Sequence, residues 1–173
     1  MIILNVNNSN PSLENTILES YISSFDFSNL TLCEALHKVL KNITMQKDYI
    51  IIDKFAKYFS KVFYERLEKE DDYNHFNSEK AMYLMVFILI LLDIDFKLKG
   101  MFFNKTENVK LIDFMILVKY LNEGLNFDND FLRESYKYIK LLGLTNLHCE
   151  NIFLNKHKLF LTKENSRNSK FFK

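Results

Sequence analysis

The sequence predicts an all-α protein, and three observations lead to this prediction. Only 3 glycines and 1 proline occur in 173 residues, so few positions interrupt regular backbone structure. Apolar residues recur at intervals of three and four, which is the helical period and not the alternating period of a strand. A hydrophobic content of 48% is sufficient to fill one core. We therefore expect an irregular right-handed stack of six to eight helices.

The first two helices are predicted from an apolar face and a capping motif. A helix is expected over about 13–23, with one apolar face made of Leu13, Ile17 and Tyr21. Thr31 and Glu34 have the spacing of a capping box, in which each side chain accepts a hydrogen bond from a backbone amide of the first turn. The second helix therefore begins at this pair and ends near residue 41.

The third and fourth helices are the longest expected. The third covers about 48–69, and its apolar stripe consists of Ile51, Phe55, Phe59, Val62 and Phe63. The fourth begins at the capping residue Ser78 and ends near Asp95. Its most apolar run, residues 82–92, is shorter than the roughly 20 residues that span a bilayer, so we expect a buried core helix.

Two further helices complete the expected fold. The fifth is expected over about 109–122, with Gly124 as its C-cap. The sixth is expected over 130–142, between Asp128 and Gly143.

The helical pattern divides the chain into three parts. We expect an N-terminal segment at 1–12, a helical domain at 13–143 and a C-terminal extension at 144–173, whose end is expected to be disordered.

Charge and cysteine content exclude several classes of function. A net charge of +1, from 23 basic and 22 acidic residues mixed along the chain, disfavours binding to nucleic acid. Cys33 and Cys149 form no CxxC pair, which indicates a reducing compartment and not a disulfide framework. His148 beside Cys149 is at most half of a metal site, so neither a metal nor a cofactor is expected. The N-terminus has no basic region or long apolar core of the kind found in a secretory signal.

Four blocks in order carry a resemblance to a known family. They read FDFSNLTLCEAL, LKNITMQKDYIIIDK, FNSEKAMYLMVFILILLDIDF and LIDFMILVKYLNEGLNFDNDFLRESYKYI. With these blocks in this order, the sequence resembles the Sec7 domain, the catalytic unit of guanine nucleotide exchange factors for Arf GTPases. The resemblance covers roughly residues 13–139 and implies an exchange factor that acts without covalent chemistry.

The resemblance assigns a catalytic position to Asp48. In the family, the loop before the third helix carries an acidic finger that enters the nucleotide site of the GTPase, repels the β-phosphate and disfavours magnesium, so that GDP leaves. This position falls on Asp48, with Gln46 and Lys47 at the places of the family's proline and glycine. Aspartate is also a favoured N-cap, so a purely structural role for Asp48 as the cap of the third helix is an equal alternative.

The same resemblance implies contacts with the switch regions of an Arf GTPase. The partner-binding residues implied are Asp53, Phe87, Ile90, Leu91 and Leu98. By periodicity alone, core packing is the favoured explanation for the three from the apolar run, and the resemblance reverses this for part of the face. The resemblance further implies a cytoplasmic protein of vesicle-mediated transport, attached to Golgi or endosomal membranes only peripherally and through partners. One alternative is a helical module that binds an Arf GTPase with weak or no exchange activity. Another is a helical scaffold that has kept the fold and lost the partner.

Overall fold

A computed structural model describes residues 2–4, 11–45, 49–67, 75–98 and 109–145. In 2–4, 11–14, 44, 45 and 98, only the backbone is described. Six helices and two very short strands lie in these ranges, in the order β1 (Ile2–Leu4), α1 (Pro11–Ser23), α2 (Leu32–Leu40), β2 (Ile43–Met45), α3 (Tyr49–Leu67), α4 (Glu79–Leu98), α5 (Leu111–Leu117) and α6 (Asn129–Leu142). The prediction of an all-α fold is confirmed.

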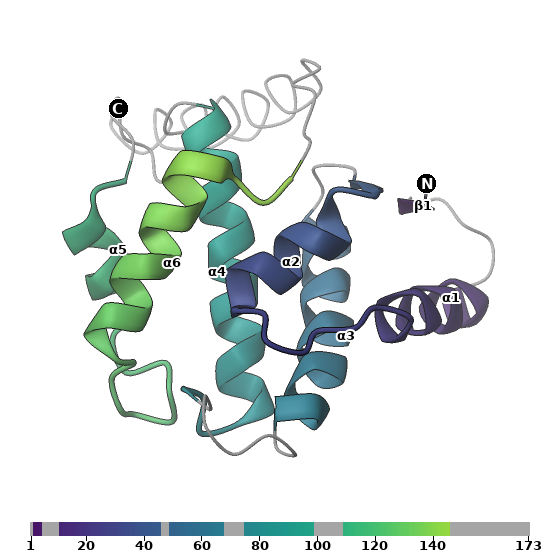
Figure 1. Cartoon of the computed structure of the whole chain (residues 1–173), viewed down its shortest axis with the longest axis horizontal. Coiled ribbons are helices and arrows are strands. Elements are labelled where there is room, and N and C mark those ends of the chain that lie inside the picture. Colours follow the sequence, from purple (N-terminus) through teal and green to yellow (C-terminus); the bar gives the residue numbers. More distant parts are fainter. Residues whose placement is uncertain (1, 5–10, 46–48, 68–74, 99–108, 146–173) are drawn as a thin grey trace, which may run out of the picture.

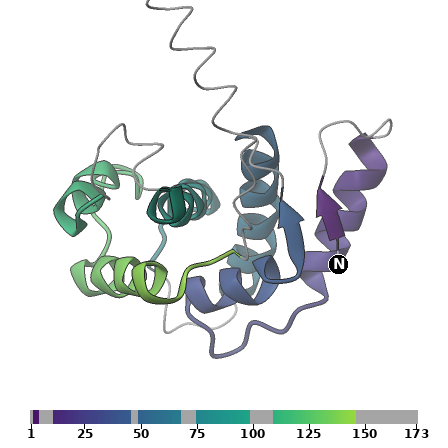
Figure 2. The same cartoon turned by 90° about the horizontal axis from the view of Figure 1, so that it is seen from above.

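Helix α4 lies in the middle of the molecule, with α3 on one side and α5 and α6 on the other (Figure 1). From above, α2 and α6 lie side by side, and α3, α4 and α5 form the layer behind them (Figure 2). The central position of α4 follows from its composition, because it has apolar residues on nearly its whole circumference. Within the described ranges, no helix combines the length and the apolar character needed to cross a membrane.

Aromatic side chains fill the contact between α3 and the segment after α1. Phe55, Phe59 and Phe63 are buried at successive turns of α3, with ring centroids 5.8 and 5.4 Å apart. Phe27 packs on the last two of these rings, at 5.8 and 5.4 Å. The apolar stripe predicted for the third helix is therefore the face that joins the core.

The helix starts follow the predicted capping residues. Thr31 and Glu34 form a complete capping box at the start of α2. The hydroxyl of Ser78 accepts a hydrogen bond from the amide of Ala81 at 3.1 Å, as an N-cap of α4 does. Asp128 accepts hydrogen bonds from two amides at the start of α6.

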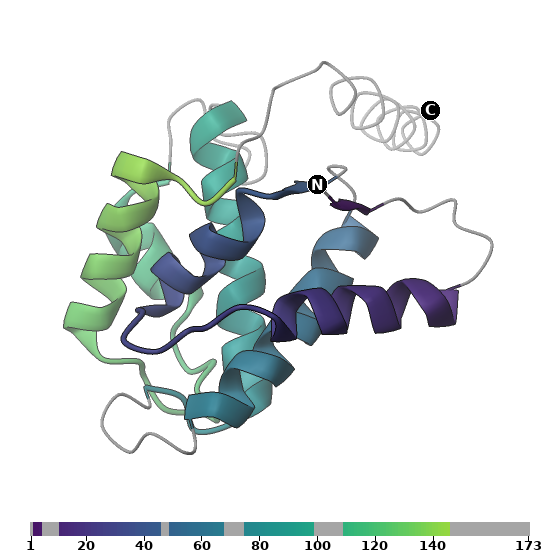
Figure 3. The ribbon, with the colours of Figure 1, turned by 45° about the vertical axis from the view of Figure 1, so that its right-hand side comes forward.

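Two details of the helices differ from the prediction. On α1, Ile17 is 49% exposed, whereas Leu18 and Ile22 are fully buried against α3, which α1 crosses in Figure 3. The predicted face was therefore wrong by about one residue. The fifth helix ends at Leu117, and Gly124 lies in a later turn with a φ of 83°, so it is not a helix cap.

The two short strands were not predicted, because three residues are too few for a sequence pattern to specify. They pair in parallel, with Ile2 beside Ile43 and Leu4 beside Met45. This pairing attaches the chain directly before residues 46–48 to the N-terminal segment. Asp48 itself lies outside the described residues.

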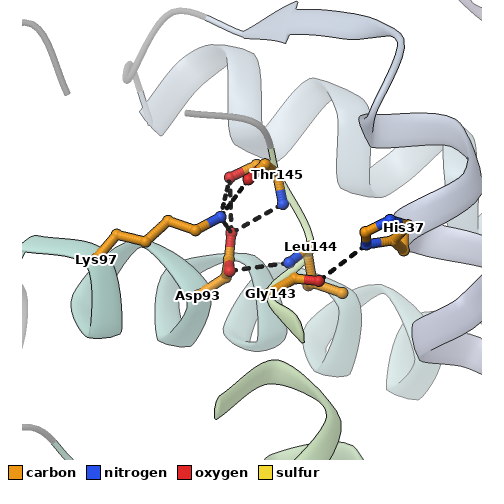
Figure 4. Close-up of polar contacts among 6 residues, drawn as sticks. All are labelled: His37, Asp93, Lys97, Gly143, Leu144 and Thr145. Atoms are coloured by element: carbon orange, nitrogen blue, oxygen red, sulfur yellow. Dashed lines mark hydrogen bonds and ion pairs between the residues drawn. The ribbon is translucent and has the colours of Figure 1, made fainter. Parts of the chain in front are cut away.

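A buried polar network attaches the chain after α6 to α4 and α2 (Figure 4). Asp93 on α4 is 1% exposed, and its carboxylate accepts hydrogen bonds from the amides of Leu144 (2.9 Å) and Thr145 (3.1 Å) and from the Thr145 hydroxyl (2.7 Å). Lys97 forms an ion pair with the same carboxylate at 2.9 Å and also donates to Thr145. His37 on α2 donates from Nδ1 to the carbonyl of Gly143 at 3.0 Å.

The network requires glycine at position 143. Gly143 has φ 71° and ψ 171°, a backbone conformation that is essentially restricted to glycine. A β-carbon there would lie 2.9 Å from the Asp93 carboxylate, which itself is held by several donors. The close approach of the two chain segments therefore depends on the missing side chain.

We expect Gly143→Ala to lower the free energy of unfolding by about 3 kcal/mol or more, because backbone strain and displacement of a buried carboxylate act together. Gly124→Ala is the matched control, since it also has positive φ but meets no atom within 4 Å. Gly124→Ala should lower the free energy of unfolding by only about 1–2 kcal/mol. Urea unfolding of both variants measures the difference, and equal losses would contradict the role of the network.

Candidate functional site

One apolar surface of α4 is not covered by the other helices. Six large apolar residues of this helix are half-buried, and all except Phe96 recur at spacings of three and four along one side. These five residues, the α4 stripe, are Tyr83, Leu84, Phe87, Ile88 and Leu91. Asp93, which holds the chain after α6, is turned by about 200° from Leu91 around the helix. The α4 stripe therefore lies on the opposite side of α4 from the buried network.

Asp53 on α3 lies beside the first residue of the α4 stripe. Its carboxylate accepts a hydrogen bond from the hydroxyl of Tyr83 and another from Lys57 Nζ, at 2.7 Å. The Lys57 ammonium also lies 5.8 Å from the centroid of the Tyr83 ring. Asp53 thus connects the two helices at one end of the stripe, while 36% of its side chain stays exposed.

These contacts change the acidity of both groups. Partial burial would raise the pKa of Asp53, but the hydrogen bonds from Lys57 and Tyr83 and the positive charge of Lys57 outweigh it, so this pKa lies below its usual value. Burial, and next the hydrogen bond to the Asp53 carboxylate and its negative charge, raise the pKa of Tyr83 to about 12. Asp53 is therefore a carboxylate and Tyr83 a neutral donor at physiological pH.

The start of α3 adds apolar surface directly after residues 46–48 in the sequence. Tyr49 and Ile50 are 41% and 65% exposed in the first turn of α3. Residues 46–48 connect Met45, the last residue of β2, with Tyr49. In the sequence, Asp48 is therefore the residue directly before α3 and five positions before Asp53.

The structure separates the predicted partner-binding residues. Phe87 and Leu91 are on the α4 stripe, and Asp53 lies beside it. Ile90 is fully buried in the core, because one residue turns a helix by about 100° away from Leu91. In this conformation Ile90 has no surface for a partner. The side chain of Leu98 lies outside the described residues.

Sequence reasoning missed Tyr83 and Lys57. The spacing contains a signal for each, because Lys57 is four residues after Asp53 and Tyr83 is four residues before Phe87. The contact between Asp53 and Tyr83, however, joins residues 30 positions apart on two helices, and no local pattern specifies such a contact.

Three other reactive groups of the described chain, Cys33, His37 and Lys97, have structural roles. Burial raises the pKa of the Cys33 thiol to about 12, so Cys33 is not a nucleophile. His37 and Lys97 are both engaged in the network after α6. Within the described ranges, no three His, Cys, Asp or Glu side chains come close enough to hold a metal ion. An apolar stripe edged by one carboxylate is suited to binding another protein.

We expect Tyr83→Phe to raise the pKa of Asp53, because the variant lacks one of the two hydrogen bonds to the carboxylate. The folded-state pKa is below the unfolded value of about 3.9, so the stabilisation from this group is complete above that pH. It is lost as the pH falls through the folded-state pKa, and the loss should begin at higher pH in Tyr83→Phe. Carbon-13 NMR titration of the Asp53 carboxyl group measures the shift. Tyr120→Phe, at an exposed tyrosine, is the control, and an unchanged Asp53 titration in Tyr83→Phe would contradict the contact.

Known proteins share this architecture. The structure is similar to the N-terminal Sec7 domain of RalF, with a TM-score of 0.65 and 22% identity over 82% of this chain and 67% of that chain. It is also similar to the Sec7p catalytic domain, with a TM-score of 0.60 and 20% identity over 73% of this chain and 64% of that chain. For a mutant of Legionella pneumophila RalF, the TM-score is 0.66 and the sequence identity is 22%, over 82% of this chain and 39% of that chain. The TM-scores show a common fold, and at identities this low the structural similarity shows the fold alone.

Sequence comparison extends the relationship from the fold to the family. An uncharacterized protein of Schizosaccharomyces pombe is 28% identical over 124 residues, which are 72% of this chain but only 8% of that protein. A model of the Sec7 domain family matches residues 3–142, which is most of the chain. The chain therefore belongs to the Sec7 domain family.

Proposed function

We propose that this chain is a guanine nucleotide exchange factor for an Arf-type small GTPase. The main support for this proposal is that a chain of the Sec7 domain family has the apolar α4 stripe with Asp53 beside it. The family's activity gives the partner class, and the stripe offers that partner an apolar contact surface. In this function the chain forms no covalent bond and requires no cofactor of its own.

The α4 stripe is the proposed contact for the switch regions of the GTPase. All five side chains are half-buried, and four of them pack against the core while part of each remains accessible, namely Tyr83, Phe87, Ile88 and Leu91. A surface that is ordered before binding loses little side-chain entropy on association. Tyr49 and Ile50 extend the apolar surface toward the loop of Asp48.

Asp48 is the proposed acidic finger. A carboxylate close to the β-phosphate destabilises bound GDP by charge repulsion, and it disfavours the magnesium ion that bridges the phosphates. Aspartate has one methylene fewer than glutamate, which shortens its reach by about 1.3 Å. An error on the order of 1 Å can cost about 100-fold in a positioned reaction, so slow exchange is expected unless the loop compensates.

Both ends of the Asp48 loop are attached to regular structure, which supports this role. On one side, β2 is paired with β1, and on the other side α3 begins at Tyr49. Asp53 further ties the first two turns of α3 to α4. This attachment would restrict the carboxylate although Gln46 and Lys47 replace the proline and glycine that the family has before its finger.

Two observations favour a second function, which is binding of the GTPase without efficient exchange. Ile90 is buried, so the α4 stripe is narrower than the resemblance implied. Lys97, at the place of the family's histidine, is bound to Asp93 and Thr145 and so is engaged within the chain. For either function, we propose that the chain acts in the cytoplasm, in vesicle-mediated transport at Golgi or endosomal membranes.

Release of GDP from an Arf GTPase tests the role of Asp48. We expect the wild-type chain to accelerate release, Asp48→Lys to abolish acceleration because the charge is reversed, and Asp48→Glu to increase it up to about 100-fold by restoring the missing reach. Fluorescence of a labelled guanine nucleotide on the GTPase measures the rate. Glu134→Lys, an acidic-to-basic change at an exposed position of α6, should behave like wild type.

Binding to the nucleotide-free GTPase is measured on the same variants. Binding without release by the wild type, with release gained by Asp48→Glu, would assign the second function. Equal release by wild type and Asp48→Lys would exclude Asp48 as the finger and leave it as a helix cap. No binding by any of the proteins would contradict both functions.

A further inference from the structure

A second apolar surface lies on α5 and on the turn that follows it, at the outer edge of the molecule (Figure 2). It contains five large apolar side chains that are between 41% and 64% exposed, and this α5 surface consists of Ile112, Ile116, Leu117, Tyr120 and Leu125. Exposed apolar side chains have an unfavourable contact with water, and five within 14 residues indicate an interaction surface.

A hollow of about 270 Å³ lies beside these side chains. Its lining includes Ile116 and Lys119, from α5 and the turn after it, and Phe127 and Leu132, from around the start of α6. The ammonium of Lys119 also lies 4.7 Å from the centroid of the Tyr120 ring, so Tyr120 is close to the hollow as well. Exposed apolar side chains and a mainly apolar hollow therefore occur next to each other.

The turn after α5 holds its exposed residues in place. Tyr120 has a φ of 65°, in the left-handed region that few aromatic residues adopt. Asn122 is 5% exposed, and it donates to the carbonyl of His75 at 3.0 Å and accepts from the amide of Asn77 at 2.8 Å. The turn is thus attached to the chain before α4. A surface that is ordered before binding loses little entropy on association.

Charges of both signs border the α5 surface. Lys119 directly precedes Tyr120, Glu123 follows it by three positions, and both are exposed. Residues 110–125 contain two lysines, one aspartate and one glutamate, so their formal charge is zero. A strongly charged partner of either sign would meet a like charge here. A second copy of the chain brings both matching charges, and two chains of net charge +1 repel each other little.

The shape of the surface also favours a second copy. Because the exposed side chains and the hollow share one surface, a two-fold axis can place a side chain of each copy in the hollow of the other. Such an arrangement is complete with two copies. At roughly 100 Å² for each side chain, the five offer on the order of 500 Å², less than the roughly 800 Å² per partner of a stable interface. The dimer expected from this area is weak and reversible.

We propose that this chain forms a weak, two-fold symmetric dimer through the α5 surface. Ile116, Tyr120 and Leu125 of each copy pack against the hollow of the other copy. Lys119 of one copy pairs with Glu123 of the other, and the axis repeats this pair. Formation of the dimer does not depend on a GTPase.

Sedimentation velocity of the full chain, at concentrations from about 1 to 200 μM, tests the proposal. We expect the sedimentation coefficient to rise with concentration, with a Kd in the micromolar range. Ile116→Glu should weaken the dimer at least tenfold, because it places a charge in an apolar contact. Ile17→Glu is the matched control, since Ile17 is 49% exposed on α1, and it should dimerise like wild type. Circular dichroism and thermal unfolding confirm that both variants are folded.

Two charge variants test the two-fold arrangement. Lys119→Glu and Glu123→Lys should each weaken the dimer about fivefold, because like charges then face each other at both symmetric positions. An equal mixture of the two variants should associate like wild type, because opposite charges meet at both positions of the mixed dimer.

A chain that stays monomeric at every concentration would overturn the proposal, and so would a dimer that Ile116→Glu leaves unchanged. A mixture of the charge variants that associates no better than either variant alone would overturn the two-fold arrangement. A monomeric wild type that binds nucleotide-free GTPase, with binding lost in Ile116→Glu, would assign the α5 surface to the GTPase instead of a second copy.

Discussion

The fold depends on the burial of α4, and on one carboxylate within it. An apolar helix of 20 residues must be covered on most of its surface, and α3 and α6 pack against it from two sides. Asp93 is nevertheless charged and 1% exposed on this helix, which is stable only because Lys97 and the backbone and hydroxyl of the chain after α6 satisfy its oxygens. The same contacts hold the residues that directly follow α6.

The two sides of α4 therefore have different roles. The Asp93 side joins α2, α4 and the end of α6 through specific polar contacts, and it requires glycine at position 143. Among the described residues, the opposite side shows no comparable network and has a half-buried apolar stripe beside Asp53. A core helix that is held on one side can present ordered side chains on the other, which is what the proposed recognition of a GTPase requires.

Features that depend on neighbouring residues in the sequence were predicted more accurately than features that depend on tertiary contacts. The caps Thr31, Ser78 and Asp128 are confirmed, because a cap depends on residues within one turn. The inward face of α1 was wrong, and Ile90 is in the core, because the rotation of a helix is decided by its neighbours and not by its own period. The strand pair depends on a contact between residues 2 and 43, which no pattern of three residues specifies. The order of the four blocks, in contrast, was sufficient for the family, which the match over 3–142 shows.

The central claim is that α4 binds a GTPase on the side opposite to the Asp93 network. Methyl NMR of the full chain with a nucleotide-free Arf GTPase tests it most directly. The account predicts that the methyl signals of Leu84, Ile88 and Leu91 shift or broaden on binding, and that those of Leu141 and Leu142 do not change. Changes at Leu141 and Leu142 with an unchanged α4 stripe would contradict it.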